Sequence, residues 1–153
     1  MTKDKRIWYI LFALYAVTMG YLLFGRTEAP EGIPYSDQLM MRLNLVPFRT
    51  LTHQLHLLTK LDRPWLVQHA LVNLLGNVVL FVPLGIFLPK LWERLQGLWK
   101  VVFATAGIIL VVEAVQVLTL LGRCDIDDLI LNLAGAAIGY GLYKWIWNKR
   151  LPE

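Results

Sequence analysis

The chain has 153 residues, of which 57% are hydrophobic and 17% charged, and its mean hydropathy is +0.53. This composition excludes an ordinary soluble domain and indicates a membrane protein. The net charge of +4 is spread over short basic segments, so it predicts membrane topology and no nucleic-acid partner.

Four apolar segments are each close to the roughly 20 residues that a helix needs to cross a hydrocarbon core of about 30 Å. They cover residues 7–24, 66–88, 101–121 and 126–147. The first is too long for the hydrophobic part of a signal peptide, and no small-residue cleavage site follows it, so we interpret it as a span. We therefore predict an all-α fold, an integral membrane four-helix bundle that forms a single domain over residues 1–153.

The tryptophans and the basic residues predict how the spans lie in the membrane. All six tryptophans fall near an end of a span, where an amphipathic ring is most stable at the water interface. Basic residues precede the first span, separate the second from the third and follow the fourth. The positive-inside rule then places both termini and the middle loop in the cytoplasm, with the other two loops outside.

The long connection over residues 25–65 is expected to have two different halves. It opens with a turn-rich stretch around Pro30, Gly32 and Pro34, for which no regular structure is expected. Within residues 51–61 the leucines recur at helical spacing, which predicts a short amphipathic helix. This helix either lies on the membrane surface or packs on the bundle as a lid.

Three histidines lie in or near this loop. His53 and His56 are one turn apart and His69 opens the second span, but their spacing matches no recognised zinc site. No metal or other cofactor is therefore predicted.

Polar side chains inside the spans are predicted to share one depth. At a rise of about 1.5 Å per residue, Asn73, Glu113 and Asn132 each lie roughly 10 Å below the outer end of their own span. An ionised glutamate at this depth costs on the order of 3 kcal/mol, so Glu113 is expected to be protonated, paired with Arg123 or in a wet cavity.

The turn between the third and fourth spans, residues 122–128, concentrates charge in an apolar chain. Asp125 and Asp128 share a helix face with Asn132, so the turn is expected to form the mouth of a polar pocket. Asp127 falls off that face and is predicted to be the most replaceable of the three aspartates. Cys124 is the chain's one cysteine and is expected to be an unremarkable small side chain.

The fourth span also carries a pair of small residues four positions apart, Gly135 and Gly139. Such a pair lets a helix approach its neighbour closely. We therefore expect a tight contact between the fourth span and another span.

Four sequence blocks follow one another in a specific order. They are NLVPF from Asn44, NLLGNVVLFVPLG from Asn73, EAVQ from Glu113, and GRCDIDD from Gly122 with the later Asn132, Gly135, Gly139 and Tyr140. Together they resemble the VanZ-like family of small bacterial membrane proteins. The resemblance implies a multi-pass protein of the bacterial plasma membrane and an association with resistance to the lipoglycopeptide teicoplanin. The family's polar positions carry over as Asn44, Asn73, Asn77, Glu113, Gln116, Arg123, Asp125, Asp128 and Asn132.

We expect these nine residues to line a ligand-binding pocket that opens to the outer leaflet of a noncatalytic or weakly catalytic protein. The expected ligand is an amphiphile: a membrane lipid, a lipid-linked wall precursor or a lipoglycopeptide. One alternative is an integral-membrane enzyme acting on a lipid-linked phosphate or glycan, with Glu113 as general acid or base and a divalent cation at Asp125 and Asp128. Another is a structural subunit that binds a second membrane protein through its glycine face.

Overall fold

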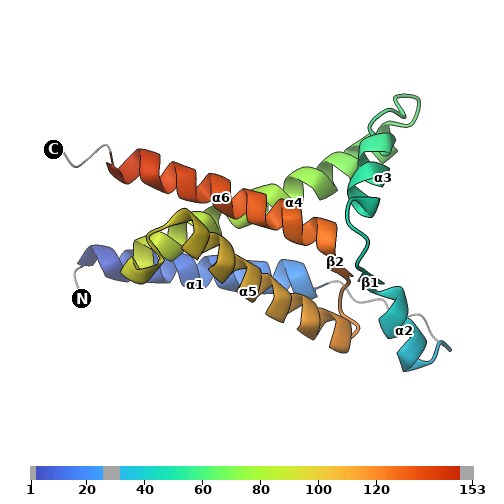
Figure 1. The fold of residues 1–153 in the computed structure, drawn as a ribbon, viewed down its shortest axis with the longest axis horizontal. Coiled ribbons are helices and arrows are strands. Elements are labelled where there is room, and N and C mark those ends of the chain that lie inside the picture. The colour runs from blue at the N-terminus through green and yellow to red at the C-terminus, as the bar shows by residue number, and fades with distance from the viewer. Residues whose placement is uncertain (1–2, 26–31, 149–153) are drawn as a thin grey trace.

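The computed structural model describes residues 3–25 and 32–148, and within these it is almost entirely helical. Helices α1 (Lys3–Phe24), α4 (Pro64–Leu91), α5 (Leu98–Leu118) and α6 (Ile126–Asn148) are each long and apolar enough to cross a membrane. Figure 1 shows α1, α5 and α6 along the long axis of the molecule, with α4 crossing them obliquely. The predicted all-α fold with four spans is confirmed, with boundaries that differ from the prediction by up to four residues.

The start of α1, the end of α6 and the connection between α4 and α5 lie at one end of the bundle, here called the terminal end (Figure 1). That connection contains a short 3-10 helix, η1 (Glu93–Leu95). The rings of Trp8 and Trp147 meet edge to face at 5.5 Å, and Lys90 Nζ lies 4.5 Å from the centre of the Trp147 ring. The start of α1, the end of α6 and the middle loop thus share one side, while the assignment of that side to the cytoplasm stays a prediction.

The opposite end, here called the loop end, contains more regular secondary structure than was predicted from the sequence. The expected amphipathic helix is α3 (Arg49–Leu57), which begins two residues before the predicted segment and ends four residues before its end. A further short helix, α2 (Tyr35–Met41), was not predicted. Gly32 and Pro34 lie outside regular structure, as expected, and Pro30 is outside the described residues.

A two-residue parallel strand pair ties the long loop to the turn between α5 and α6. Strand β1 (Leu43–Asn44) pairs with β2 (Cys124–Asp125), and the Cys124 amide donates to the Arg42 carbonyl at 2.9 Å. Two sequence blocks about 80 residues apart are held together by this pair.

The most extensive helix contact is between α4 and α6, through glycines on both helices. A Cβ atom placed on Gly135 or Gly139 would overlap the carbonyl oxygen of Val78 or Val82, and one on Gly85 would overlap that of Ala136. The two backbones therefore touch, which confirms the close approach predicted from Gly135 and Gly139. We call this contact the glycine interface.

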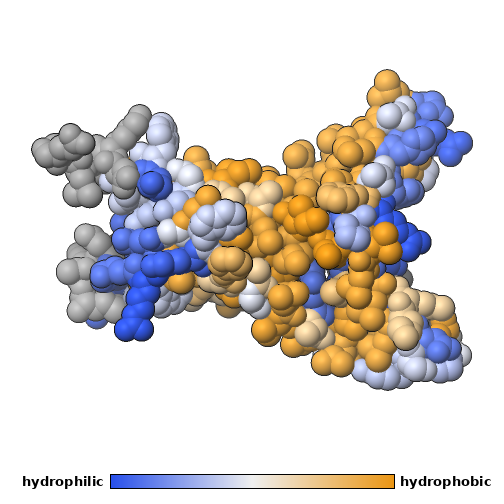
Figure 2. All heavy atoms as spheres, viewed as in Figure 1, coloured by the Kyte–Doolittle hydropathy of each residue, from blue (hydrophilic) through white to orange (hydrophobic). Residues whose placement is uncertain are grey.

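The outer surface of the bundle is apolar between its two ends. Figure 2 shows hydrophilic residues at the terminal end and at the tip of the loop end, with apolar surface between them. Large apolar side chains such as Val17, Phe103 and Val111 are more than half exposed. In a soluble domain such a surface would be unstable, whereas in a membrane it faces lipid.

Candidate functional site

The first turn of α6 is the point where the family-like blocks meet. Asp125 precedes the helix and its Oδ1 accepts the Asp127 amide at 3.0 Å, which is the usual bond of an N-terminal cap. Its Oδ2 accepts from Asn44 Nδ2 at 3.0 Å and from Thr50 Oγ1 at 2.5 Å. Both carboxylate oxygens of Asp125 are therefore engaged, Oδ1 with the start of α6 and Oδ2 with the long loop.

Asp127 caps a different helix. Its side chain is 1% exposed, and it accepts the amides of Phe48 at 2.6 Å and Leu51 at 2.9 Å. These are the N-cap and N3 amides of α3. In a capping box the side chain of the N-cap residue accepts the N3 amide, and the side chain of the N3 residue accepts the N-cap amide. The cap residue of α3 is Phe48, whose side chain has no acceptor, so the aspartate of α6 takes over this role.

The expectation that Asp127 is the most replaceable of the three aspartates therefore loses its structural basis. The residue does lie off the face of Asp125 and Asp128. That side of α6 is covered by α3, however, and helix periodicity within the spans does not reveal this contact.

Asp128 and Asn77 connect α6 to α4. Asn77 Nδ2 donates to Asp128 Oδ1 at 2.5 Å, and one turn or more away on α4 the Asn73 amide lies 3.2 Å from His69 Nε2. The polar face of α4 is thus bonded to the start of α6 and continues beyond it toward the loop end.

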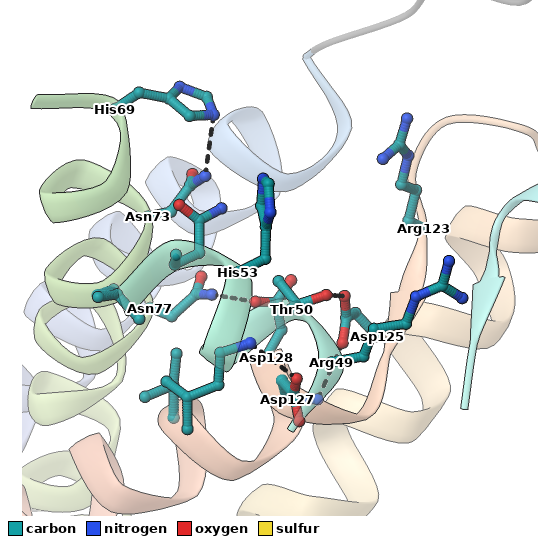
Figure 3. Close-up of a pocket in the computed structure, with 14 residues that line it drawn as sticks. Arg49, Thr50, His53, His69, Asn73, Asn77, Arg123, Asp125, Asp127 and Asp128 are labelled. Carbon is teal, nitrogen blue, oxygen red and sulfur yellow. Dashed lines mark hydrogen bonds between the residues drawn. The ribbon is translucent and has the colours of Figure 1, made fainter. Parts of the chain in front are cut away.

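These residues surround a cavity of about 660 Å³ at the loop end, here called the loop-end cavity. It lies between α3, α4 and the start of α6 (Figure 3). In Figure 3 His69 and Asn73 lie on one side, Arg49 and Arg123 on the other, and His53 between them. The lining residues are Arg49, Thr50, Leu51, His53, Gln54, His69, Asn73, Leu74, Asn77, Arg123, Asp125, Asp127, Asp128 and Leu131.

Two arginines at this cavity have no ion pair or side-chain hydrogen bond among the described residues, and we call them the uncommitted arginines. They are Arg49 and Arg123, and both are exposed. The neighbouring aspartates accept hydrogen bonds from Asn44, Thr50, Asn77 and backbone amides instead. Of the three alternatives expected for Glu113, pairing with Arg123 is therefore not formed among the described residues.

A second cavity of about 310 Å³, here called the bundle cavity, lies between α1, α4, α5 and α6. Glu113, Gln116 and Asn132 line it, all less than 10% exposed. It shares four lining residues with the loop-end cavity, so the two are adjacent: Asn73, Asn77, Arg123 and Asp128. The polar residues of three spans therefore meet around one space, as their predicted depths indicated.

The bundle cavity contains polar atoms with few protein partners. Asn132 Oδ1 is buried and accepts no hydrogen bond in the described part of the chain. Glu113 Oε2 accepts from Cys124 Sγ at 3.3 Å, and Gln116 Nε2 donates to the Leu23 carbonyl at 2.7 Å. A buried acceptor without a partner costs about 1–3 kcal/mol, so a water or a ligand donor at Asn132 would be stabilising.

Cys124 is more than the unremarkable side chain that the sequence suggested. Burial raises the pKa of its thiol to about 11, and the nearby Glu113 carboxyl adds to this shift. The thiol is therefore protonated near neutral pH and acts as a donor to Glu113. A protonated thiol is a poor nucleophile.

Eight of the nine predicted site residues line one of the two cavities, and the ninth, Asn44, is bonded to Asp125. Their role in ligand binding stays a prediction. Arg49, Thr50 and Asp127 also line the loop-end cavity but were not among the predicted site residues, although the first two directly follow the NLVPF block. His53 and His69 also line the loop-end cavity, but among the described residues no three His, Cys, Asp or Glu side chains are grouped closely enough to hold a metal ion.

Comparison with known proteins gives two matches. Residues 12–147 match the VanZ/LLP1 family. The chain is also 27% identical over 143 residues to Protein VanZ of Enterococcus faecium, an alignment that covers 94% of this chain and 76% of that protein. No solved structure matches the chain.

Proposed function

Because the chain belongs to the VanZ/LLP1 family, we propose that it acts in the bacterial cell envelope in resistance to teicoplanin. We propose further that it does so by binding the anionic head group of a membrane amphiphile in the loop-end cavity. The family match and the similarity to Protein VanZ support the role in resistance. The cavity supports the binding mode.

The two uncommitted arginines carry this proposal. Arg49 and Arg123 come from different parts of the chain and border the same cavity, while the acidic groups between them are already hydrogen-bonded. Arginine binds phosphate and carboxylate through charge-assisted, often bidentate hydrogen bonds. A phosphate or carboxylate is therefore the ligand group that this arrangement fits best.

The adjoining bundle cavity favours a head group that also carries donors. Glu113 and the partnerless Asn132 Oδ1 are acceptors, so they would be satisfied by hydroxyl, amide or ammonium groups. A lipid-linked wall precursor and a lipoglycopeptide both combine acidic groups with many such donors. An anionic membrane lipid such as phosphatidylglycerol also combines a phosphate with hydroxyl donors, so it stays with these two as a ligand class that we propose.

Binding is better supported than catalysis. A divalent cation at Asp125 and Asp128 would need free carboxylate oxygens. Asp125 uses both of its oxygens, for the Asp127 amide and for Asn44 and Thr50, and Asp128 Oδ1 accepts from Asn77. The enzyme alternative stays a prediction. The orientation that would expose the loop end at the outer face follows from the positive-inside rule and is part of the proposal.

Teicoplanin susceptibility of cells that express variant chains tests this function. We expect the double variant Arg49→Ala/Arg123→Ala to lose resistance at normal membrane expression. The matched control is Arg63→Ala, an exposed arginine of the same loop that pairs with Asp62. Full resistance of the double variant would contradict the binding mode, and loss of resistance in both variants would point to a general effect of charge.

A further inference from the structure

We propose that the apolar groove between α1, α4 and α5 holds a hydrocarbon chain of the amphiphile whose head group occupies the loop-end cavity. This inference rests on the proposed function and adds a second part to the same site. The groove has a volume of about 200 Å³ and is lined by residues such as Met19, Gly20, Leu84 and Ile108.

The groove offers nothing polar to a ligand. Its one polar side chain is Tyr15, whose hydroxyl already donates to the Leu80 carbonyl at 2.8 Å. Its floor is formed by buried apolar side chains, among them Phe81 and Ile109. Because the lining lies within membrane-spanning helices, an aliphatic chain is the occupant that matches its chemistry.

The groove adjoins the polar site. Leu23, Phe81, Ile109 and Val112 line both the groove and the bundle cavity, and the bundle cavity in turn adjoins the loop-end cavity. The order of these neighbouring spaces, here called the path, is therefore exposed arginines, then buried acceptors, then an apolar groove. This sequence of environments matches an amphiphile with a charged head, a polar linkage and a hydrocarbon tail.

The partnerless acceptor of Asn132 lies in the middle of this path. Asn132 is 7% exposed and lines the bundle cavity, and its buried Oδ1 has no donor among the described residues. A head group of an amphiphile threaded along the path would place its hydroxyl or amide donors at this depth. The apolar tail would then continue into the groove.

The length of the groove fits one leaflet. From Leu23 to Phe12, both of which line the groove, α1 rises about 16 Å. Half of a hydrocarbon core of about 30 Å is about 15 Å. An acyl chain that starts at the loop end would therefore reach the middle of the membrane inside the groove.

The groove is expected to select and orient the ligand more than to increase affinity. Lipid tails are as apolar as the groove, so moving a chain from the bilayer into it gives little hydrophobic gain. The head group would supply the binding energy, and the groove would restrict which amphiphiles fit.

Photocrosslinking tests the proposal on the full chain in lipid nanodiscs. The probe is phosphatidylglycerol with a diazirine halfway along one acyl chain, diluted in phosphatidylcholine, with crosslinked residues mapped by mass spectrometry. For the wild type we expect labels concentrated on residues that line the groove. Phosphatidylcholine with the same diazirine chain should label them less, because its head has no net negative charge.

Two leucine variants provide a matched pair. Cβ atoms on Gly20 and Gly107 would meet no heavy atom within 4 Å, so both backbones leave room for a side chain to begin, but only Gly20 lines the groove. Gly20→Leu should lower groove labelling about tenfold by filling the space, while Gly107→Leu should leave it unchanged. Thermal stability of both variants checks that each is folded.

The outcomes separate this inference from the proposed function. Unchanged groove labelling in Gly20→Leu, or labels spread evenly over all four spans, would overturn the groove. Groove labelling that falls in Gly20→Leu but persists in Arg49→Ala/Arg123→Ala would keep the groove and overturn the head-group site. Labelling that falls in both variants and not in Gly107→Leu is the result that we expect.

Discussion

The two sides of the bundle differ in how closely their helices pack. On one side α4 and α6 touch backbone to backbone at the glycine interface, with no room for a single methyl group at Gly135 or Gly139. On the other side α1 leaves a groove against α4 and α5, and a Cβ on its Gly20 would meet nothing. The tight side fixes the polar residues of α4 and α6 relative to each other, and the open side leaves space for a ligand.

Breaking the glycine interface should have the largest effect. Gly139→Leu would force α6 away from the Val82 carbonyl, and we expect it to cost about 3 kcal/mol or more and to abolish accumulation of folded protein. The control on the same helix is Gly141→Leu, where a Cβ meets nothing within 4 Å. Size-exclusion profiles of fluorescent fusions in detergent report both, and equal profiles would show that the interface is not needed.

Removing the cap that α6 gives to α3 should have the next largest effect. Asp127→Ala leaves the Phe48 and Leu51 amides without an acceptor, which we expect to cost about 3 kcal/mol. Hydrogen exchange of α3 should rise, while the exposed control Asp62→Ala should leave it unchanged. Undiminished protection of residues 48–51 in Asp127→Ala would restore the view that this aspartate is replaceable.

The glycine interface and the Asp127 cap also differ in whether the sequence predicts them. The spans and the close approach of α6 were predictable because apolar runs and glycine spacing are local signals. The roles of Asp127 and Thr50 were not, because their partners lie 76 and 75 residues away along the chain. No helical periodicity reports that α3 packs against the start of α6, so the free arginines and the engaged aspartates emerged only from the fold.

The reactivity of the Cys124 thiol reports the contact between the turn before α6 and Glu113 of α5. Its thiol contacts Glu113, and its pKa is raised to about 11 by burial and by that carboxyl. At pH 8 we therefore expect alkylation by a maleimide about a hundredfold slower than for an exposed thiol, with the rate still rising up to about pH 11. A rate that levels off near pH 9 would contradict the contact.

The smallest expected change in stability is at the C-terminal end of α5, one of the helices that line the groove. Leu120 has φ of 58°, and the amides of Leu120 and Leu121 close the helix end on the carbonyls of Val117 and Gln116. This is a Schellman motif with leucine where glycine is preferred, so Leu120→Gly should stabilise the protein by about 1 kcal/mol. Thermal unfolding measures this, with Leu121→Gly as the control that should destabilise; a lower midpoint for Leu120→Gly would contradict the motif.

The central claim is that Arg49 and Arg123 bind an anionic head group at the loop end. It is tested most directly by titrating the purified protein with a soluble short-chain phosphatidylglycerol at low and high salt. We expect saturable, salt-sensitive binding that weakens by about tenfold or more in Arg49→Ala/Arg123→Ala and is unchanged in Arg63→Ala. Equal affinities for the wild type and the double variant at low salt would contradict it.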